Sequence, residues 1–482
     1  MNVRPYDQKQ KLLLPNDVRD FLSPAHEIHL VNDIIERFDL SSFYEAIPEV
    51  GNPSYHPKLM IKILFYGLVQ GITSSRLLAR KCCSDVAYMY LAAMQKPDFR
   101  TISKFRIRHL ASISQLFAQV VATCQDMGLV SMDHIAIDGT RLKANASASE
   151  LFDRERAVRH HDRLKDEIRK RLDHMGAQDA LEDQLYGEDS SGYEAPPELR
   201  NHAARIKKLD RLIKELHKEK KDKKKNLTDP DSEIQKTEFG KKPGYNGQVS
   251  VDGKHNVIVA TDVTSSPSDV HQLKPMVEQS QSNTGKKLSK ISADAGYSSH
   301  ANLEYVKERG TDAYIPDKRY QHQIKRGNPT GICPYDKSRF TYIPEEDVYL
   351  CPAGAKAYPP GYAKNLKDPF PLIYTVKGMW RCTGCEHSRK GCTKRFGSNR
   401  TIQISGKEHL IDAMRAKLQT PEGKAVYRKR KQIVETAFGY LKHNMNLRSF
   451  TLRGLEKVRL EFRMWCMGYN LKKIILHSAP VG

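Results

Sequence analysis

The sequence predicts an α/β protein in which a mixed sheet follows an all-α N-terminal region. Apolar residues recur at helical spacing through most of residues 1–130, which is typical of short amphipathic helices. Residues 135–140 and 288–294 each contain a short apolar run that leads into an aspartate, Asp138 or Asp294, and each run predicts a buried strand. Residues 245–263 form two more apolar runs around an Asp-Gly pair, which is a strong hairpin signal. Strands interleaved with helices indicate a layer with both antiparallel and parallel pairing.

The chain carries a large excess of positive charge. Its 482 residues include 79 Lys and Arg against 57 Asp and Glu, a formal charge of +22. Such an excess favours an anionic partner, first nucleic acid and then a membrane surface. The hydrophobic fraction of 39% excludes an integral membrane protein, and the N-terminus lacks the apolar segment of a secretion signal. Nine cysteines do not resemble a secreted disulfide framework, so we expect a reducing, cytoplasmic location.

Residues 1–130 are expected to form a helical DNA-binding domain. Pro57 suits the first turn of a helix whose apolar positions follow at helical spacing. After a break at 97–98, a further amphipathic segment turns its apolar residues inward and leaves cations outside, namely Lys104, Arg106 and Arg108. Short helices with one basic face resemble a helix-turn-helix DNA-binding bundle. An ordinary helical domain with solvated cations is the alternative, and this segment alone does not separate the two.

The region 141–227 is expected to be a helical insertion. Its apolar residues lie at helical spacing in two segments, 151–175 and 199–216, with a polar stretch between them. Two amphipathic helices of this length predict an antiparallel hairpin inserted into the surrounding domain, residues 131–480. The second arm ends in a basic run, Lys218–Lys225, which is either a solvated face or a phosphate contact.

Three carboxylates stand out by their positions. Asp138 and Asp294 each end an expected strand, and Glu435 lies in an expected C-terminal helix. Converging carboxylates repel one another unless a cation neutralises them, and their hard oxygens suit Mg²⁺ or Mn²⁺. Two such ions about 3.5–4 Å apart support an in-line phosphoryl displacement. The alternative for each acid taken singly is a turn or helix-cap residue.

The segment 317–420 is rich in Gly, Pro and Cys and has little periodicity, and we expect it to be a Cys-rich, zinc-binding insertion. Cysteines within it could close a tetrahedral structural Zn²⁺ site, namely Cys351, Cys382, Cys385 and Cys392. In a segment without its own apolar core, such a metal would supply folding energy. Cys333 or His387 could replace one ligand, and a set of free thiols is the alternative. The other cysteines lie in apolar helical contexts and are expected in the core, namely Cys82, Cys83, Cys124 and Cys466.

The residues around the first two acids resemble motifs of a known family. Asp138 opens the stretch Asp-Gly-Thr-Arg-Leu-Lys-Ala-Asn-Ala-Ser, and Asp294 opens Asp-Ala-Gly-Tyr-Ser. These stretches are similar to the first and second acidic motifs of DDE transposases of bacterial insertion sequences, in the groups related to the IS-four and IS-five elements. Residues 55–105 are similar to the family's N-terminal DNA-binding region. Residues 228–246 resemble a subgroup that carries a long insertion after the first strand.

The C-terminal helix resembles the family's third motif, a Tyr, Arg, Glu, Lys signature. Tyr427 and Arg430 have the usual two residues between them, and Glu435 and Lys442 have the usual six. Arg430 and Glu435 are separated by four residues instead of three. The signature arginine therefore stays open between Arg430 and a displaced Lys431 or Arg428.

The resemblance implies an RNase H-like core in which Asp138, Asp294 and Glu435 hold two Mg²⁺ ions. It implies that the chain binds the terminal inverted repeats of its element, cleaves the phosphodiester at each end and joins the freed 3′-OH to target DNA. The partner would be double-stranded DNA, and the pairing of two ends implies at least a dimer during the reaction. DNA-backbone contacts would come from Lys442, Tyr427 and Arg430. Two alternatives remain: a transposase-derived DNA-binding protein without catalysis, and an RNase H-fold nuclease that cuts without strand transfer.

Overall fold

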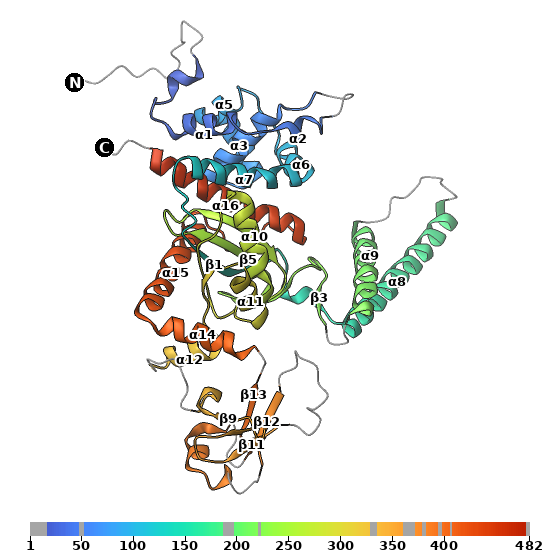
Figure 1. Cartoon of the computed structure of the whole chain (residues 1–482). Coiled ribbons are helices and arrows are strands. Elements are labelled where there is room, and N and C mark those ends of the chain that lie inside the picture. The colour runs from blue at the N-terminus through green and yellow to red at the C-terminus, as the bar shows by residue number, and fades with distance from the viewer. Residues whose placement is uncertain are drawn as a thin grey trace, which may run out of the picture.

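The protein consists of a helical group stacked on a mixed sheet, with a helical hairpin and a small β region extending from them (Figure 1). The computed structural model describes residues 17–47, 53–186, 197–219, 223–327, 335–359, 372–377, 382–393, 398–404 and 407–478. Helices and strands alternate through the central part. The predicted α/β class is therefore confirmed.

The N-terminal helices pack around α3, which is buried on nearly all sides. Aspartate and serine N-caps begin several of them: Ser74, Asp85 and Asp98 each accept a hydrogen bond from a backbone N–H of the following helix. The long C-terminal helix α16 (Leu455–Ser478) packs against α3 and α7 from the opposite end of the chain (Figure 1). One hydrophobic core therefore includes residues of these helices and of the sheet. The elements are η1 (Val18–Phe21), α1 (Glu27–Glu36), α2 (Ser41–Tyr44), α3 (Pro57–Val69), α4 (Ser75–Ser84), α5 (Val86–Leu91), α6 (Phe99–Arg108) and α7 (Leu110–Asp126).

The central sheet has the strand order β4-β5-β1-β7-β8, and β6 pairs with β5. β1 pairs antiparallel with β5 and parallel with β7, and β7 pairs parallel with β8. The hairpin predicted around Asp252 and Gly253 joins β5 to β6. Helices α10 (Leu273–Thr284) and α15 (Pro421–Gly439) pack on this sheet, and α11 (His300–Glu308) follows β7. The strands are β1 (His134–Lys143), β4 (Glu233–Thr237), β5 (Gly240–Asp252), β6 (Ile258–Thr264), β7 (Lys290–Ala293) and β8 (Asp312–Tyr314).

The two amphipathic helices expected after the first strand are present as α8 (Arg154–Tyr186) and α9 (Pro197–Lys218). They form an antiparallel pair that projects away from the sheet (Figure 1). A short strand pair, β2 (Leu151–Phe152) with β3 (Lys225–Asn226), closes its base. The pair has a small apolar core of its own, made of Phe152, Ala157, Leu164, Leu209, Leu212, Leu216 and Leu227.

The cysteine-rich segment is more regular than the sequence predicts. It contains a five-stranded antiparallel sheet in the order β13-β12-β11-β10-β9 with its own apolar cluster. The expectation that this segment lacks an apolar core of its own was wrong. Strands of three to five residues are too short to give a clear period in the sequence, so the pattern did not reveal the sheet that builds this core. Helices α12 (Lys318–Lys325) and α14 (Glu408–Gln419) flank this sheet in the chain. The strands are β9 (Thr341–Ile343), β10 (Val348–Leu350), β11 (Lys356–Tyr358), β12 (Leu372–Val376) and β13 (Thr401–Ile404).

Candidate active site

The register of two parallel strands brings Asp138 and Asp294 side by side. The last paired positions of β1 and β7 are Ile137 and Ala293, and each aspartate is the next residue along the chain. Asp294 follows the end of β7, as expected. The expectation that Asp138 ends its strand was wrong, because β1 continues to pair with β5 as far as Lys143. Asp138 therefore lies within a long strand, at the level where its parallel neighbour stops.

The carboxylate of Asp138 is held between a backbone amide and an arginine. Its Oδ1 accepts from the Gly139 N–H at 2.8 Å, and its Oδ2 accepts from Nη1 of Arg430 at 2.9 Å. Burial raises the pKa of Asp138, Arg430 partly offsets that effect, and the nearby charge of Asp294 adds to it. The site therefore favours an additional positive charge beside Asp138.

Arg430 reaches Asp138 from α15, and it lies against the ring of Tyr427. The guanidinium carbon is 5.5 Å from the centroid of that ring. Burial works to lower the pKa of Arg430, but Asp138 and Tyr427 more than offset it, so this pKa is raised. Burial also raises the pKa of Tyr427. Among the arginine positions left open by the sequence, Arg430 is the one that contacts Asp138: Arg428 is exposed, and Lys431 pairs with Glu435.

Glu435 is not brought to the two aspartates. Its side chain is 64% exposed and lies 3.6 Å from Nζ of Lys431. It lies five positions after Arg430 on α15, which corresponds to about 7.5 Å along the axis and a different side of the helix. Among the residues that the structure describes, no group of three or more His, Cys, Asp or Glu side chains is arranged to hold a metal ion.

Lys442 lies beyond the end of α15, in the π-helical turn η7 (Tyr440–Asn444). Lys442 falls seven positions after Glu435, and on an uninterrupted α-helix that spacing predicts that both side chains lie on one face. The wider i→i+5 turn changes the direction of the side chains that follow it. Lys442 is half-buried there.

A fourth carboxylate, Asp269, lies behind the site, and the sequence reading did not single it out. It is 6% exposed and accepts hydrogen bonds from Arg141, Asn246 and Gln248. Its position just before η3 (Val270–Gln272) makes it look like an ordinary helix-cap residue. Its donors are remote in the sequence, so only the fold identifies them.

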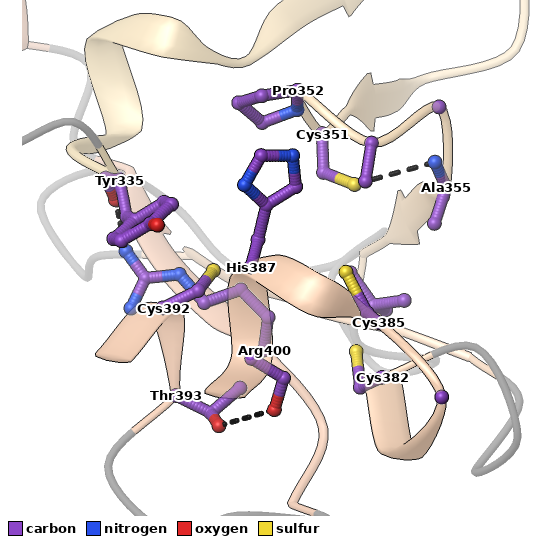
Figure 2. A pocket seen from close by; sticks show the side chains of 15 residues that line it. Tyr335, Cys351, Pro352, Ala355, Cys382, Cys385, His387, Cys392, Thr393 and Arg400 are labelled. Carbon is purple, nitrogen blue, oxygen red and sulfur yellow. Dashed lines mark hydrogen bonds between the residues drawn. The ribbon is translucent and has the colours of Figure 1, made fainter. Parts of the chain in front are cut away.

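The four cysteines proposed as zinc ligands line one cavity of about 480 Å³ (Figure 2). Cys382 is buried, and Sγ of Cys351 accepts from the Ala355 N–H at 3.3 Å. Burial raises the pKa of Cys392, and the other three thiols are near enough to act on it in the same direction. His387 lines this cavity too, whereas Cys333 lies outside the described residues. The thiols therefore gather at one place without forming a metal-binding arrangement.

The other cysteines differ in part from expectation. Cys82, Cys124 and Cys466 are buried, but Cys83 is exposed because α4 turns it away from the core.

On α6, Lys104 and Arg108 are exposed as expected. The expectation for Arg106 was wrong: it turns inward and donates to the Thr73 carbonyl at 2.8 Å and to Oγ of Ser75. Arg106 thereby joins α6 to the start of α4, and this burial lowers its pKa.

Two family models match parts of the chain. A Transposase domain (DUF772) matches residues 16–108, and a Transposase DDE domain matches residues 350–475. Together they cover less than half of the chain. The second match includes Glu435 and the four cysteines that line the cavity, whereas Asp138 and Asp294 lie outside both.

Among curated proteins, none matches the chain. Within the described residues, no helix is both long enough and apolar enough to cross a bilayer. Transposases act on DNA, and DDE transposase domains generally use divalent metal ions such as Mg²⁺. The two matches support a DDE transposase family for this chain, and with it a transposase function.

Proposed function

We propose that this protein is a DNA transposase that binds the inverted repeats of its insertion sequence, cleaves the phosphodiester at each end and joins the 3′-OH to target DNA. The observation that carries the proposal is the β1–β7 register, which sets Asp138 and Asp294 on neighbouring strands at one level. An RNase H-like core would use two strand-borne acids in this way. The Transposase DDE domain match, which includes Glu435, supports the same reaction.

Asp138 and Asp294 fit a divalent cation by their chemistry. Both supply hard carboxylate oxygens, and the like charge of Asp294 acts on the buried Asp138, which favours a cation that neutralises the two. Mg²⁺ or Mn²⁺ bound there would activate the attacking oxygen and neutralise charge on the phosphate. We propose Glu435 as the third ligand. Because its side chain is exposed and paired with Lys431, it would join the aspartates only after its side chain or α15 moves.

Arg430 and Tyr427 would act on the DNA backbone. In the structure, Nη1 of Arg430 donates to Oδ2 of Asp138 at 2.9 Å. A planar guanidinium can bind a phosphate as well as a carboxylate. In the proposed reaction, Arg430 would release Asp138 and bind the phosphate next to the scissile bond. Lys442 and the exposed Lys104 and Arg108 would contribute further backbone contacts.

The outer face of α9 is a further candidate for DNA contacts. Its cationic face consists of Lys207, Arg211, Lys214 and Lys218, all exposed. Their spacing puts them on one side of the helix over about 16 Å, opposite the buried Leu209, Leu212 and Leu216. None of the four pairs with a carboxylate among the side chains that the structure describes. Like charges at these spacings destabilise a helix by about 0.2–0.5 kcal/mol per pair, and a bound polyanion would remove that cost.

The basic run that follows α9 is expected to contribute less. Residues 220–222 lie outside the described part of the chain. Lys223 and Lys225 pair with glutamates, Lys223 with Glu219 at 3.2 Å and Lys225 with Glu215 at 2.8 Å. Cations that are already paired have less to gain from a phosphate.

The proposal is tested with labelled duplexes taken from the DNA on each side of the gene. The parent protein with Mg²⁺ and a target plasmid should give cut and joined products. Glu435→Gln should bind the same duplex but neither cut nor join it. Glu422→Gln is the matched control, because Glu422 is also exposed on α15, and it should retain both activities. Cleavage by Glu435→Gln at the parent rate would remove Glu435 from the site.

A second candidate is a transposase-derived protein that binds DNA without catalysis. The position of Glu435, exposed and apart from the two aspartates, favours it. The same assay separates the candidates, since this protein would shift the duplex without cutting it. An RNase H-fold nuclease would instead cut the duplex and leave the plasmid without joined ends.

Two further parts of the proposal concern assembly and zinc. Joining two element ends would require at least two copies of the chain in one complex with DNA. The cysteine cavity would hold a structural Zn²⁺ only after its thiols come closer together, since the described residues do not form a metal-binding group. The gathering of four thiols around one cavity supports that site.

A further inference from the structure

The buried carboxylate of Asp269 is fully engaged by hydrogen-bond donors. Its Oδ1 accepts from Nδ2 of Asn246 at 2.7 Å and from Nε2 of Gln248 at 2.8 Å. Its Oδ2 accepts from Nη2 of Arg141 at 2.7 Å. Arg141 also donates to the Pro267 carbonyl at 2.9 Å. A buried carboxylate with three side-chain donors, one of them charged, is held in one orientation.

Asp269 and Asp138 lie on opposite faces of the sheet. Across the β1–β5 ladder, Arg141 is opposite Asn246 and Gly139 is opposite Gln248. Directly opposite residues share a face, and successive residues alternate between faces. Asp138 therefore points toward Arg430 of α15, whereas Asp269 lies behind it on the side of Gly139.

Two glycines rest directly on Asp269. A Cβ atom on Gly139 would lie 2.9 Å from Oδ1 of Asp269, and one on Gly296 would lie 2.9 Å from Oδ2. The N–H groups of these glycines donate to the two site aspartates, Gly139 to Asp138 at 2.8 Å and Gly296 to Asp294 at 2.7 Å. Each backbone segment that orients a site carboxylate therefore touches Asp269.

The same network extends to the loop that follows Asp294. Tyr297 is fully buried and donates its hydroxyl to Oε1 of Gln248. Asn302 donates to the carbonyls of Val270 and Tyr297, each at 2.7 Å. The segment that carries Asp269 and the loop that carries Asp294 are thus joined to each other and to β5.

We infer that Asp269 is a positioning residue, which holds the strand segment after Asp138 and the turn after Asp294 at a fixed separation so that their carboxylates can share divalent cations. The inference rests on the proposed function. Asp269 is not itself a ligand, because both of its oxygens are engaged and it lies on the other face of the sheet. Asparagine at position 269 would keep the shape of the side chain, but its amide N–H₂ would face one of the present donors. It would also leave Arg141 without a negatively charged partner.

The test measures metal binding directly on the full chain. Free Mn²⁺ is followed by electron paramagnetic resonance as it is titrated into the parent protein and into Asp269→Asn. Loss of a residue that orients metal ligands costs about 10- to 100-fold in metal affinity, and we expect a loss in that range. Cleavage of the labelled end duplex by Asp269→Asn should recover as Mn²⁺ is raised, and its affinity for the duplex should be unchanged. Mn²⁺ affinity equal to that of the parent would overturn the inference.

A matched control separates positioning from a loss of stability. Asp229 is 1% exposed and accepts from the Tyr245 hydroxyl at 2.8 Å and from the Gly454 N–H at 3.1 Å. Asp229→Asn disturbs a buried carboxylate away from the site, so it should lower thermal stability without changing Mn²⁺ affinity. An equal loss of Mn²⁺ affinity in Asp229→Asn would show that the effect of Asp269→Asn is general destabilisation, and would overturn the inference.

A second variant covers the case in which Asp269→Asn does not fold. Gln248→Leu removes the link between Asp269 and Tyr297 from β5, without a change beside either aspartate in the sequence. It should weaken Mn²⁺ binding in the same direction, and an unchanged affinity would overturn the inference. A parent protein that binds no Mn²⁺ and cuts no duplex would instead overturn the proposed function, which distinguishes the two failures.

Discussion

The ion pair between Asp138 and Arg430 leads to a quantitative stability prediction. Its N–O distance is 2.9 Å, and the side chains of Arg430 and Asp138 are 13% and 24% exposed. Loss of one partner from a fully buried pair costs about 3–5 kcal/mol, because the other charge is left alone in a poorly solvated site. Since both side chains retain some contact with water, we expect Arg430→Gln to lower the free energy of unfolding by about 2–3 kcal/mol.

A double-mutant cycle isolates this interaction. The variant Asp138→Asn/Arg430→Gln leaves no lone charge, so its cost should be smaller than the sum of the two single costs by about 1–2 kcal/mol. Urea unfolding followed by circular dichroism, in the presence of a chelator, measures the four proteins. The control is Lys431→Gln, which breaks the exposed pair with Glu435 and should cost no more than about 0.5 kcal/mol.

Additive costs would refute this reasoning. If the single-variant costs sum to that of the double variant within about 0.5 kcal/mol, Asp138 and Arg430 do not stabilise each other. Mn²⁺ provides a second check, because a bound cation can replace the missing guanidinium. It should raise the melting temperature of Arg430→Gln more than that of the parent, and equal shifts would also contradict the account.

Three further predictions concern other parts of the molecule. Burial lowers the pKa of His134 to about 4, whereas the histidine of the unfolded chain has a pKa of about 6.5. Between these two pH values the unfolded state binds more protons than the folded state. The free energy of unfolding should therefore rise as the pH increases from about 4 to about 6.5. His134→Asn should flatten that rise in urea titrations, and an unchanged slope would assign it to other groups. Replacing the four cations of the α9 face with glutamine should weaken duplex binding and reduce the slope of log affinity against log salt concentration by up to about 3–4. Glutamines at the exposed Lys286 and Lys287 should change this slope little. An undiminished slope in the α9 variant would place the DNA contacts elsewhere. Metal analysis should find about one Zn²⁺ per chain, Cys382→Ser should abolish it, and zinc-free folded protein would exclude the site.

The sequence predicted the strands that carry the two aspartates because local patterns specify them. Short apolar runs interrupted by turn residues indicate buried strands, whichever partners those strands have. The pairing of β1 with both β5 and β7 depends instead on residues more than a hundred positions apart. For that reason the sequence placed Asp138 at a strand end, whereas the ladder with β5 extends the strand to Lys143.

Local patterns also could not predict which way individual side chains point. Arg106 and Lys104 look alike in the sequence, yet only Arg106 turns inward to the Thr73 carbonyl. Asp269 reads as a helix cap, although Arg141, Asn246 and Gln248 surround its carboxylate. In each case the partner comes from another element, so the choice between a solvated and a buried side chain is made by packing.

By itself, the sequence determined the alternation of helices and strands and the positive charge, and it supplied the carboxylates that we propose as metal ligands. These properties depend on residue type and on short-range periodicity, which survive without knowledge of the partners. Only the tertiary structure decided that Asp138 and Asp294 lie at the same level of neighbouring strands, that Arg430 forms an ion pair with Asp138 and that Glu435 is exposed. Those outcomes depend on strand register and on the rotation of α15 against the sheet, which arise from contacts between distant parts of the chain.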